Sequence, residues 1–301
     1  MVIDIHAHYY PPEYLERIGR PELPPSEAAP LASQSVEERL ELLDRFGVDA
    51  QVLSVSQAQP YLPVATGAAD AAALVNDLTV ELSEKHPGRF FTFASLPLPH
   101  VDASLAELDR VFGADPVVGV SVGCSVAGLQ LDDPVLEPVF DELDRRRAVV
   151  FVHPIGQETT PWLAGRNLAW LVGAPFEDTV AALRLVLGGV VERHPNIAFI
   201  VPHLGGTIPF LLARLTTKGG ERIHRGLQSL YYDTVSGSAD ALVSSARALG
   251  TSRLLLGTDY PYCDADQFAG HLEYLDHAHF GTDALAAVKG GTAAHLLALD
   301  R

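Results

Sequence analysis

The sequence predicts an α/β protein in which residues 1–301 form a single domain with the (β/α)8 fold, the TIM barrel. Short apolar runs rich in β-branched residues alternate with longer stretches of helical periodicity, as expected for parallel strands covered by helices. Eight such runs occur in 301 residues, which fits one closed barrel better than an open, doubly wound sheet. No glycine-rich nucleotide-binding motif follows any of these runs, which further disfavours the open sheet.

The predicted strands are short and nearly continuously apolar, as strands buried on both faces are. They are Val2–His8, Ala50–Val55, Phe90–Leu96, Val117–Val122, Val149–His153, Ile197–His203, Leu230–Thr234 and Arg253–Thr258.

The stretches between the strands have helical periodicity. In Val36–Phe46, apolar residues stand at positions 36, 40, 43 and 46, which places them on one face of a helix. The other predicted helices are Ala68–His86, Val101–Phe112, Asp133–Arg147 and Thr179–Arg193. Two of them run into His-Pro, and a proline ends a helix and restricts the residue before it.

One segment interrupts the alternation of strands and helices. Residues Tyr9 to Ser35 lie between the first strand and the first regular helix, and they include six prolines. On a TIM barrel this position is on the catalytic face. We therefore expect a proline-rich insertion that forms a lid or a pocket wall.

The net charge, the lengths of the apolar runs and the number of cysteines exclude some classes of binding partner and location. Lysine and arginine total 21 against 38 acidic residues, a formal net charge of −17, whereas a nucleic-acid binder needs a basic surface. No apolar run reaches the roughly 20 residues of a membrane helix, and the first residues lack the features of a signal peptide. With only two cysteines, Cys124 and Cys263, we expect a cytoplasmic protein that binds neither nucleic acid nor membrane.

Histidine and aspartate residues gather at the carboxyl ends of the predicted strands, where barrel enzymes carry their catalytic groups. The first strand ends in His6-Ala7-His8, the fifth in His153, the sixth in His203 and the last in Asp259. All of these ends belong to the same rim of a barrel, so these side chains should lie together.

His6 and His8 are two residues apart, so their side chains point to the same face of a strand, with Cα atoms roughly 6.6 Å apart. Two imidazoles at this spacing can bind one ion, and imidazole and carboxylate ligands suit Zn²⁺ and similar divalent ions. Asp4 is expected on the same face, where it would either support a ligand or make a structural contact lower in the barrel.

The sequence resembles the amidohydrolase superfamily, and within it the branch typified by aminocarboxymuconate semialdehyde decarboxylase. The matching motifs are spread over nearly the whole chain in the family's order. They are IDIHAHYYP at 3–11, FVHP at 151–154, WLVGAPFEDT at 170–179, HPNIAFIVPHLGGTIP at 194–209, YYDT at 231–234 and GTDYPY at 257–262.

The resemblance implies a role for each of these residues. His6, His8, His153 and Asp259 would bind the metal, and Asp259 could also carry a proton. His203 would be the acid/base beside the metal, and Trp170 would pack at the edge of the pocket. Arg214, eleven residues after His203, would bind the carboxylate of a small-molecule substrate from the neighbouring subunit, which implies a homodimer.

We expect one metal ion per chain. Amidohydrolases that bind two ions use a carboxylated lysine at a strand end, and none of the three lysines, Lys85, Lys218 and Lys289, ends a predicted strand. Zn²⁺ is expected, with Mn²⁺ as the alternative. A purely structural zinc site is disfavoured, because neither cysteine falls among the converging strand ends.

The substrate contacts depart from the family's pattern in one place. The family has an arginine just before the first helix, whereas residues 30–35 contain none; Arg17 and Arg20 lie earlier and could replace it. This difference weakens the case for the dicarboxylate semialdehyde as the substrate. Tyr9, Tyr10, Gln57 and Tyr61 follow the first two strands and are expected to line the pocket.

The expected ligand set supports two classes of reaction. The first is non-oxidative decarboxylation of an unsaturated or aromatic carboxylic acid. The second is hydrolysis of a lactone, ester or amide, or hydration of a double bond, by water that the metal activates. The motifs at 170–179 and 257–262 resemble the decarboxylase branch, so decarboxylation is favoured.

Overall fold

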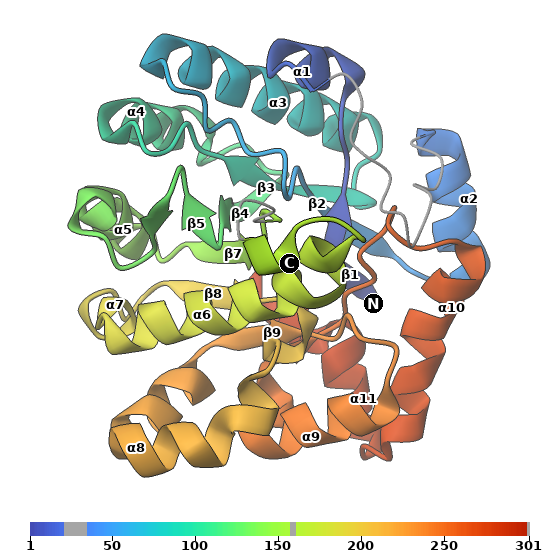
Figure 1. The fold of residues 1–301 in the computed structure, drawn as a ribbon. Coiled ribbons are helices and arrows are strands. Elements are labelled where there is room, and N and C mark those ends of the chain that lie inside the picture. The colour runs from blue at the N-terminus through green and yellow to red at the C-terminus, as the bar shows by residue number, and fades with distance from the viewer. Residues whose placement is uncertain (21–34, 157–160, 300–301) are drawn as a thin grey trace.

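The computed structural model describes residues 1–20, 35–156 and 161–299. Eight parallel strands form one sheet in the order β1-β2-β3-β4-β7-β8-β9-β10, and helices surround it (Figure 1). The strands are β1 Ile3–His8, β2 Ala50–Ser54, β3 Phe90–Ser95, β4 Val117–Gly123, β7 Val149–His153, β8 Ala198–Val201, β9 Tyr231–Asp233 and β10 Leu254–Leu255.

Backbone hydrogen bonds join the first strand to the segment at and after the last one. Ile5 N donates to Leu256 O at 2.9 Å, and His8 N donates to Tyr260 O at 2.7 Å. The sheet therefore closes on itself, and the predicted (β/α)8 barrel is confirmed. All eight predicted strands are present, although β8, β9 and β10 are shorter than expected.

The helices lie outside the barrel. They are α1 Pro12–Arg17, α2 Val36–Phe46, α3 Ala65–Lys85, α4 Val101–Val111, α5 Glu137–Arg145, α6 Ala174–Leu187, α7 Val190–Arg193, α8 Ile208–Ser229, α9 Ala239–Leu249, α10 Ala265–Glu273, α11 Thr282–Ala286 and α12 Thr292–Leu296. None of the helices in the described ranges is long and apolar enough to span a bilayer.

Local signals explain which helix boundaries could be predicted. The prediction for α2 is exact, because the Ser35 side chain accepts a hydrogen bond from Glu38 N and Gly47 ends the helix with φ +68°. The predicted helix 179–193 was wrong about where the helix begins and about its being continuous. It begins earlier, at Ala174, and a break at Gly189 (φ +74°) separates α6 from α7.

A two-stranded hairpin, β5 Ser125–Val126 and β6 Leu129–Gln130, was not predicted. The predicted insertion after the first strand is only partly within the described residues, because residues 21–34 lie outside them. Its first part forms α1, with Pro12 in the first turn, a position that needs no backbone N–H donor.

The lower part of the barrel is filled by apolar side chains from several strands. This core includes Ile3, Ile5, Val52, Phe93, Phe151, Ile200 and Leu255, all at most 2% exposed. The polar residues at the carboxyl ends of the strands lie next to this core. The packed apolar side chains therefore fix the positions of the strand ends.

The expected position of Asp4 was wrong. Strand β1 is irregular between Asp4 and Ala7, where the N–H groups of Thr258 and Asp259 both point at His6 O, and this irregularity breaks the alternation of side chains. Asp4 accepts hydrogen bonds from Gln51 and Thr258, on the side of the sheet that α2 covers. It therefore does not share a face with His6.

Arg39 of α2 is fully buried and supports the end of strand β1 from outside the barrel. Its guanidinium donates to His8 O at 2.6 Å and to Gln51 Oε1 at 2.9 Å, and it stacks 4.5 Å from the centre of the Tyr260 ring. The guanidinium thus holds together the end of β1, strand β2 and the loop after β10.

Replacing Arg39 with methionine is expected to destabilise the protein by about 2–4 kcal/mol, because each buried acceptor left without a donor costs about 1–3 kcal/mol. Urea denaturation followed by circular dichroism measures the change. Arg45→Met, an exposed residue on the same helix, is the control. Equal stability of the two variants would contradict this role for Arg39.

Candidate metal and catalytic site

Four side chains meet at the carboxyl end of the barrel. His6 and His8 come from β1, His153 ends β7, and Asp259 follows β10. The ligand atoms of all four lie within 4.8 Å of one another. His6 Nε2 lies 3.1 Å from both His8 Nε2 and His153 Nε2, and Asp259 Oδ1 lies 2.9 Å from His8 Nε2.

The outer nitrogen of each imidazole has a partner of its own. A carboxylate or carbonyl oxygen only accepts hydrogen bonds, so a Nδ1 atom beside one carries the proton and Nε2 keeps a lone pair. The pairs are His6 Nδ1 with Asp233 Oδ2 at 2.6 Å, His8 Nδ1 with Ser54 Oγ at 2.9 Å, and His153 Nδ1 with Pro154 O at 2.7 Å.

In the neutral rings of His6 and His153 the converging Nε2 atoms are therefore acceptors that face one another, whereas the Ser54 hydroxyl beside His8 Nδ1 can either donate or accept. Nitrogen lone pairs 3.1 Å apart, beside a carboxylate oxygen, repel unless a proton or a metal ion lies between them. Imidazole nitrogen and carboxylate oxygen are ligands that zinc and other divalent ions take. The four residues fit one such ion.

Without a bound ion, the electrostatics of the cluster favour one positive charge, carried as a second proton on His6. Burial lowers the pKa of His8 to about 4 and holds that of His153 well below its ordinary value, so both are neutral. Burial alone would also lower the pKa of His6, but the carboxylates of Asp233 and Asp259 together raise it to about 9. The carboxylates of Asp233 and Asp259 thus stabilise a positive charge at the centre of the cluster.

His203 lies beside the cluster and outside the four-residue group. Its Nδ1 pairs with Asp178 Oδ2 at 2.8 Å, and its Nε2 lies 4.0 Å from Asp259 Oδ2. Burial would lower the pKa of His203, but the carboxylate of Asp178 raises it well above the ordinary value. This histidine therefore holds a proton close to the cluster.

The turn that carries His203 has a left-handed backbone. Its φ values are +52° at His203, +57° at Leu204, +77° at Gly205 and +60° at Gly206. Asp259 also has a positive φ, +61°. Such backbone at non-glycine residues costs roughly 1–3 kcal/mol each and concentrates at functional sites.

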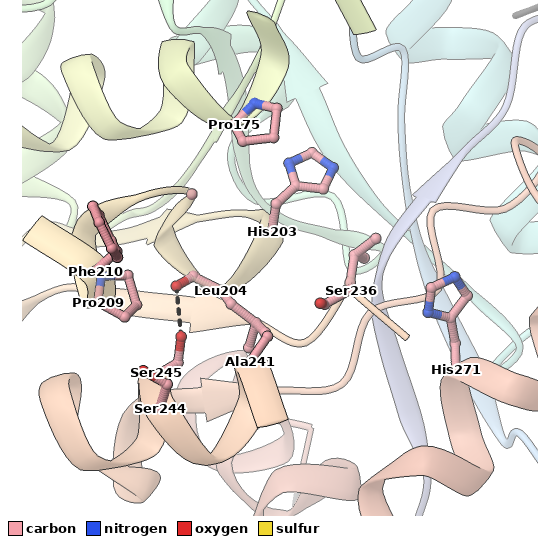
Figure 2. Close-up of a pocket in the computed structure, with 12 residues that line it drawn as sticks. Pro175, His203, Leu204, Pro209, Phe210, Ser236, Ala241, Ser244, Ser245 and His271 are labelled. Carbon is pink, nitrogen blue, oxygen red and sulfur yellow. Dashed lines mark hydrogen bonds between the residues drawn. The ribbon is translucent and has the colours of Figure 1, made fainter. Parts of the chain in front are cut away.

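A pocket of about 520 Å³ opens next to His203 (Figure 2). It lies between the ends of β8 and β9 and the helices α8, α9 and α10. Its lining includes His203, Phe210, Val235, Ser236, Ser244 and His271. A substituted aromatic acid fits a volume of this size.

Sequence profiles and known structures place the chain among related proteins. The amidohydrolase family profile matches residues 3–299. The chain belongs to the amidohydrolase family. It is 30% identical over 279 residues to the 2-amino-3-carboxymuconate-6-semialdehyde decarboxylase of Dictyostelium discoideum, covering 87% of this chain and 76% of that protein.

Two further relatives resemble this amidohydrolase over most of their length. The gamma-resorcylate decarboxylase of Rhodococcus jostii is 29% identical over 294 residues, with 87% of each chain covered. The structure of apo IDCase from Metarhizium anisopliae superimposes with a TM-score of 0.87 at 27% identity, covering 100% of this chain and 98% of that one.

Two carboxylates that contact the candidate site of this amidohydrolase were not singled out in the sequence. Asp233 and Asp178 are both fully buried. Asp233 holds His6 Nδ1 and also accepts from the backbone N–H of His203 at 2.9 Å. Asp233 is the last residue of strand β9, and this position at a strand end was a signal in the sequence that it lies at the rim. Asp178 lies within helix α6, so the rule that functional groups follow strand ends does not identify it.

The predicted substrate contacts do not gather around His203. Tyr61 lines a cavity of about 240 Å³ with Gln57, and its hydroxyl accepts a hydrogen bond from Gly123 N at 2.9 Å. Tyr9 lines another cavity, of about 290 Å³. Tyr10, by contrast, lies with its ring centre 6.1 Å from that of His8.

Trp170 and Arg214 were the other two predicted contacts. Trp170 is half-buried in the π-helical turn Ala169–Gly173 and packs against Gly156, three residues after His153. Arg214 is exposed on α8. Neither residue lines the pocket beside His203.

Replacing Asp178 with asparagine is expected to lower kcat by about 10²-fold or more, because the carboxylate keeps the proton on His203 and fixes its ring. Metal content should not change, since Asp178 contacts none of the four converging residues. Steady-state kinetics with elemental analysis of the same sample provide the test. A loss of metal, or unchanged kcat, would contradict the role assigned to Asp178.

Proposed function

We propose that the protein is a metal-dependent, non-oxidative decarboxylase of an unsaturated or aromatic carboxylic acid. The observation that carries this proposal is the His203–Asp178 pair, which holds a proton beside the cluster of His6, His8, His153 and Asp259. The names of the relatives, which include decarboxylases of muconate-type and aromatic acids, support the same reaction.

The proposed metal ligands are His6, His8, His153 and Asp259, and the proposed ion is Zn²⁺, with Mn²⁺ as the alternative. When bound, such an ion polarises a coordinated oxygen and neutralises negative charge. A single ion is proposed because the three lysines lie on α3, on α8 and in the π-helical turn Ala287–Gly291, away from the cluster.

In the proposed reaction, the bond between the substrate carbon and its carboxylate breaks and CO₂ leaves. The electron pair of that bond stays on the carbon, which must take up one proton. His203 supplies that proton from Nε2, and Asp259 Oδ2, 4.0 Å away, lies close enough to share it through one water. Solvent then returns the proton to His203, whose positive form Asp178 stabilises.

We also propose that the protein is a homodimer in which Arg214 of one copy faces the pocket of the other. Arg214 is exposed on α8 and follows Phe210 by one helical turn, and the Phe210 side chain is 89% exposed at the mouth of the pocket. An exposed aromatic next to a cation is suited to a subunit interface. Two buried, free cysteines support the proposed cytoplasmic location.

A release assay tests the reaction class. The metal-loaded protein is incubated with a panel of hydroxybenzoates and muconate-type acids, and in parallel with a panel of lactones and esters. We expect CO₂ release from at least one acid and no hydrolysis of the lactones and esters. Turnover of lactones or esters alone would refute decarboxylation and support the hydrolase.

A further inference from the structure

Asp4 is a fully buried carboxylate at the seam where strand β1 meets the segment after β10. It accepts four hydrogen bonds, two on each oxygen. Oδ1 accepts from the backbone N–H groups of His6 and Thr258, both at 3.1 Å. Oδ2 accepts from Thr258 Oγ1 at 2.6 Å and from Gln51 Nε2 at 2.7 Å. One side chain thus joins the two segments on either side of the seam.

Each of these two segments carries a proposed metal ligand. His6 is itself a ligand, and Thr258 directly precedes the ligand Asp259. The ligand atoms His6 Nε2 and Asp259 Oδ1 lie 3.1 Å apart. A single atom, Asp4 Oδ1, accepts from the peptide N–H groups of His6 and Thr258. It therefore fixes the two ligand-bearing backbones relative to each other.

The backbone at Asp259 needs such support. Its φ of +61° is a costly conformation for a residue other than glycine, and it persists only where the surroundings enforce it. Asp259 N donates to His6 O at 2.8 Å, and Tyr260 N donates to Thr258 Oγ1 at 3.3 Å. The Thr258 hydroxyl therefore links Asp4 to the residue that follows Asp259.

The four donors around position 4 require a group that only accepts hydrogen bonds. A carboxylate does so, whereas an asparagine amide would turn two N–H donors toward donors that are already there. Gln51 cannot relieve that conflict by rotating its amide without losing the bond that its Oε1 accepts from Arg39 at 2.9 Å. Arg39 is also fully buried, so its positive charge compensates that of Asp4 through the Gln51 amide.

We propose that Asp4 is a positioning residue for the metal site, which sets the separation of His6 and Asp259 and thereby the affinity and the coordination geometry of the ion. It acts through the backbone, because its hydrogen-bond partners lie on the side of the sheet that α2 covers. This inference rests on the proposed metal ligands. It holds for decarboxylation and for hydrolysis alike, because both reactions would use the same ion.

Titration of Co²⁺ into the metal-free protein tests the proposal. Co²⁺ binds the same nitrogen and oxygen ligands as Zn²⁺, and its visible absorption depends on their arrangement. Asp4→Asn should bind Co²⁺ about 10–100-fold more weakly than the native protein, the range for groups that orient metal ligands. Its visible spectrum at saturating Co²⁺ should differ from the native spectrum.

Substitutions of Thr258 test the same link without changing the charge of Asp4. Thr258→Val removes the hydroxyl between Asp4 and Tyr260 N and should weaken Co²⁺ binding about tenfold. Thr258→Ser keeps the hydroxyl and should bind Co²⁺ as the native protein does. The matched control is Thr92→Val, because the Thr92 hydroxyl is buried and makes no hydrogen bond to any described residue. This control should leave the affinity and the spectrum unchanged.

Circular dichroism and urea denaturation of each metal-free variant separate positioning from a general loss of stability. Weak binding by a variant that is folded at the start of the titration supports the proposal. Native affinity and a native spectrum in both Asp4→Asn and Thr258→Val would overturn it, even if both variants unfold at lower urea concentration. If Asp4→Asn does not fold, the comparison of Thr258→Val with Thr258→Ser decides.

The outcomes for Asp4 and for the proposed function are distinguishable, because none of these measurements reads CO₂. Native Co²⁺ binding that the variants leave unchanged would refute only the role of Asp4. A native protein that binds no Co²⁺ would refute the metal ligands and this role together. Weakened Co²⁺ binding in the variants, combined with turnover of lactones alone by the native protein, would refute decarboxylation and support the role of Asp4.

Discussion

Replacing His203 with alanine is expected to lower kcat by about three orders of magnitude, in line with the 10²–10⁴-fold contribution of a positioned acid or base. The variant should still bind one metal ion per chain. His203 Nε2 lies 4.0 Å from Asp259 Oδ2, and the histidine is not among the four residues whose ligand atoms converge. Loss of turnover without loss of metal is the expected signature of a proton donor.

The control for this substitution is His277→Ala, which removes an exposed imidazole. It should leave both kcat and metal content at the native level. If His203→Ala retains more than about a tenth of native kcat, His203 is not the acid/base, because that contribution is below the usual range. A His203→Ala protein that loses its metal would instead place His203 among the ligands.

Replacing His153 with alanine is expected to have the other large effect, which is loss of the metal and of activity together. Partners that merely orient a ligand contribute about 10–100-fold to metal affinity, so removal of a ligand should exceed that range. His153 contributes one of the three Nε2 atoms at the centre of the cluster. Metal content after dialysis against a weak chelator measures the effect.

Asp233→Asn offers a graded comparison for His153→Ala. Asp233 contacts the outer nitrogen of His6 at 2.6 Å and does not belong to the converging group. This variant should therefore lose about 10–100-fold in metal affinity and remain active at high metal concentration. If His153→Ala binds the metal more tightly than Asp233→Asn, the assignment of His153 as a ligand is wrong.

The fold and the converging residues were predictable from the sequence for one physical reason. In a parallel barrel the carboxyl ends of all strands meet at one rim, so residues that end separate strands, such as His8, His153 and Asp259, must be neighbours. Strand ends also carry clear signals, because an apolar run stops there. Their convergence could thus be predicted from the strand order alone, whereas their proposed roles as metal ligands come from the resemblance to the family.

Features that depend on hydrogen bonds between distant segments could not be predicted. The irregularity in β1 arises because two N–H groups, of Thr258 and Asp259, point at one carbonyl of His6, and it places Asp4 outside the barrel. Asp178 reaches His203 from inside a helix, where its contact depends on how α6 packs.

The predicted substrate contacts Tyr9 and Tyr61 lie in separate cavities, and they stay a prediction. Tyr9 follows His8 directly, and the alternation of side chains points it away from the rim, toward the cavity lined by Lys85 and His86. Tyr61 reaches back to the end of β4 through Gly123 N. Loop residues near a rim can point in several directions, and the sequence alone does not choose among them.

We propose above that one divalent ion, held by His6, His8, His153 and Asp259, supports decarboxylation. Titration of Zn²⁺ into the metal-free protein, with CO₂ release followed on the most active acid of the panel, tests it most directly. We expect the rate to rise linearly and to stop rising at one equivalent per chain. A break at two equivalents, or CO₂ release that does not depend on the added metal, would contradict the claim.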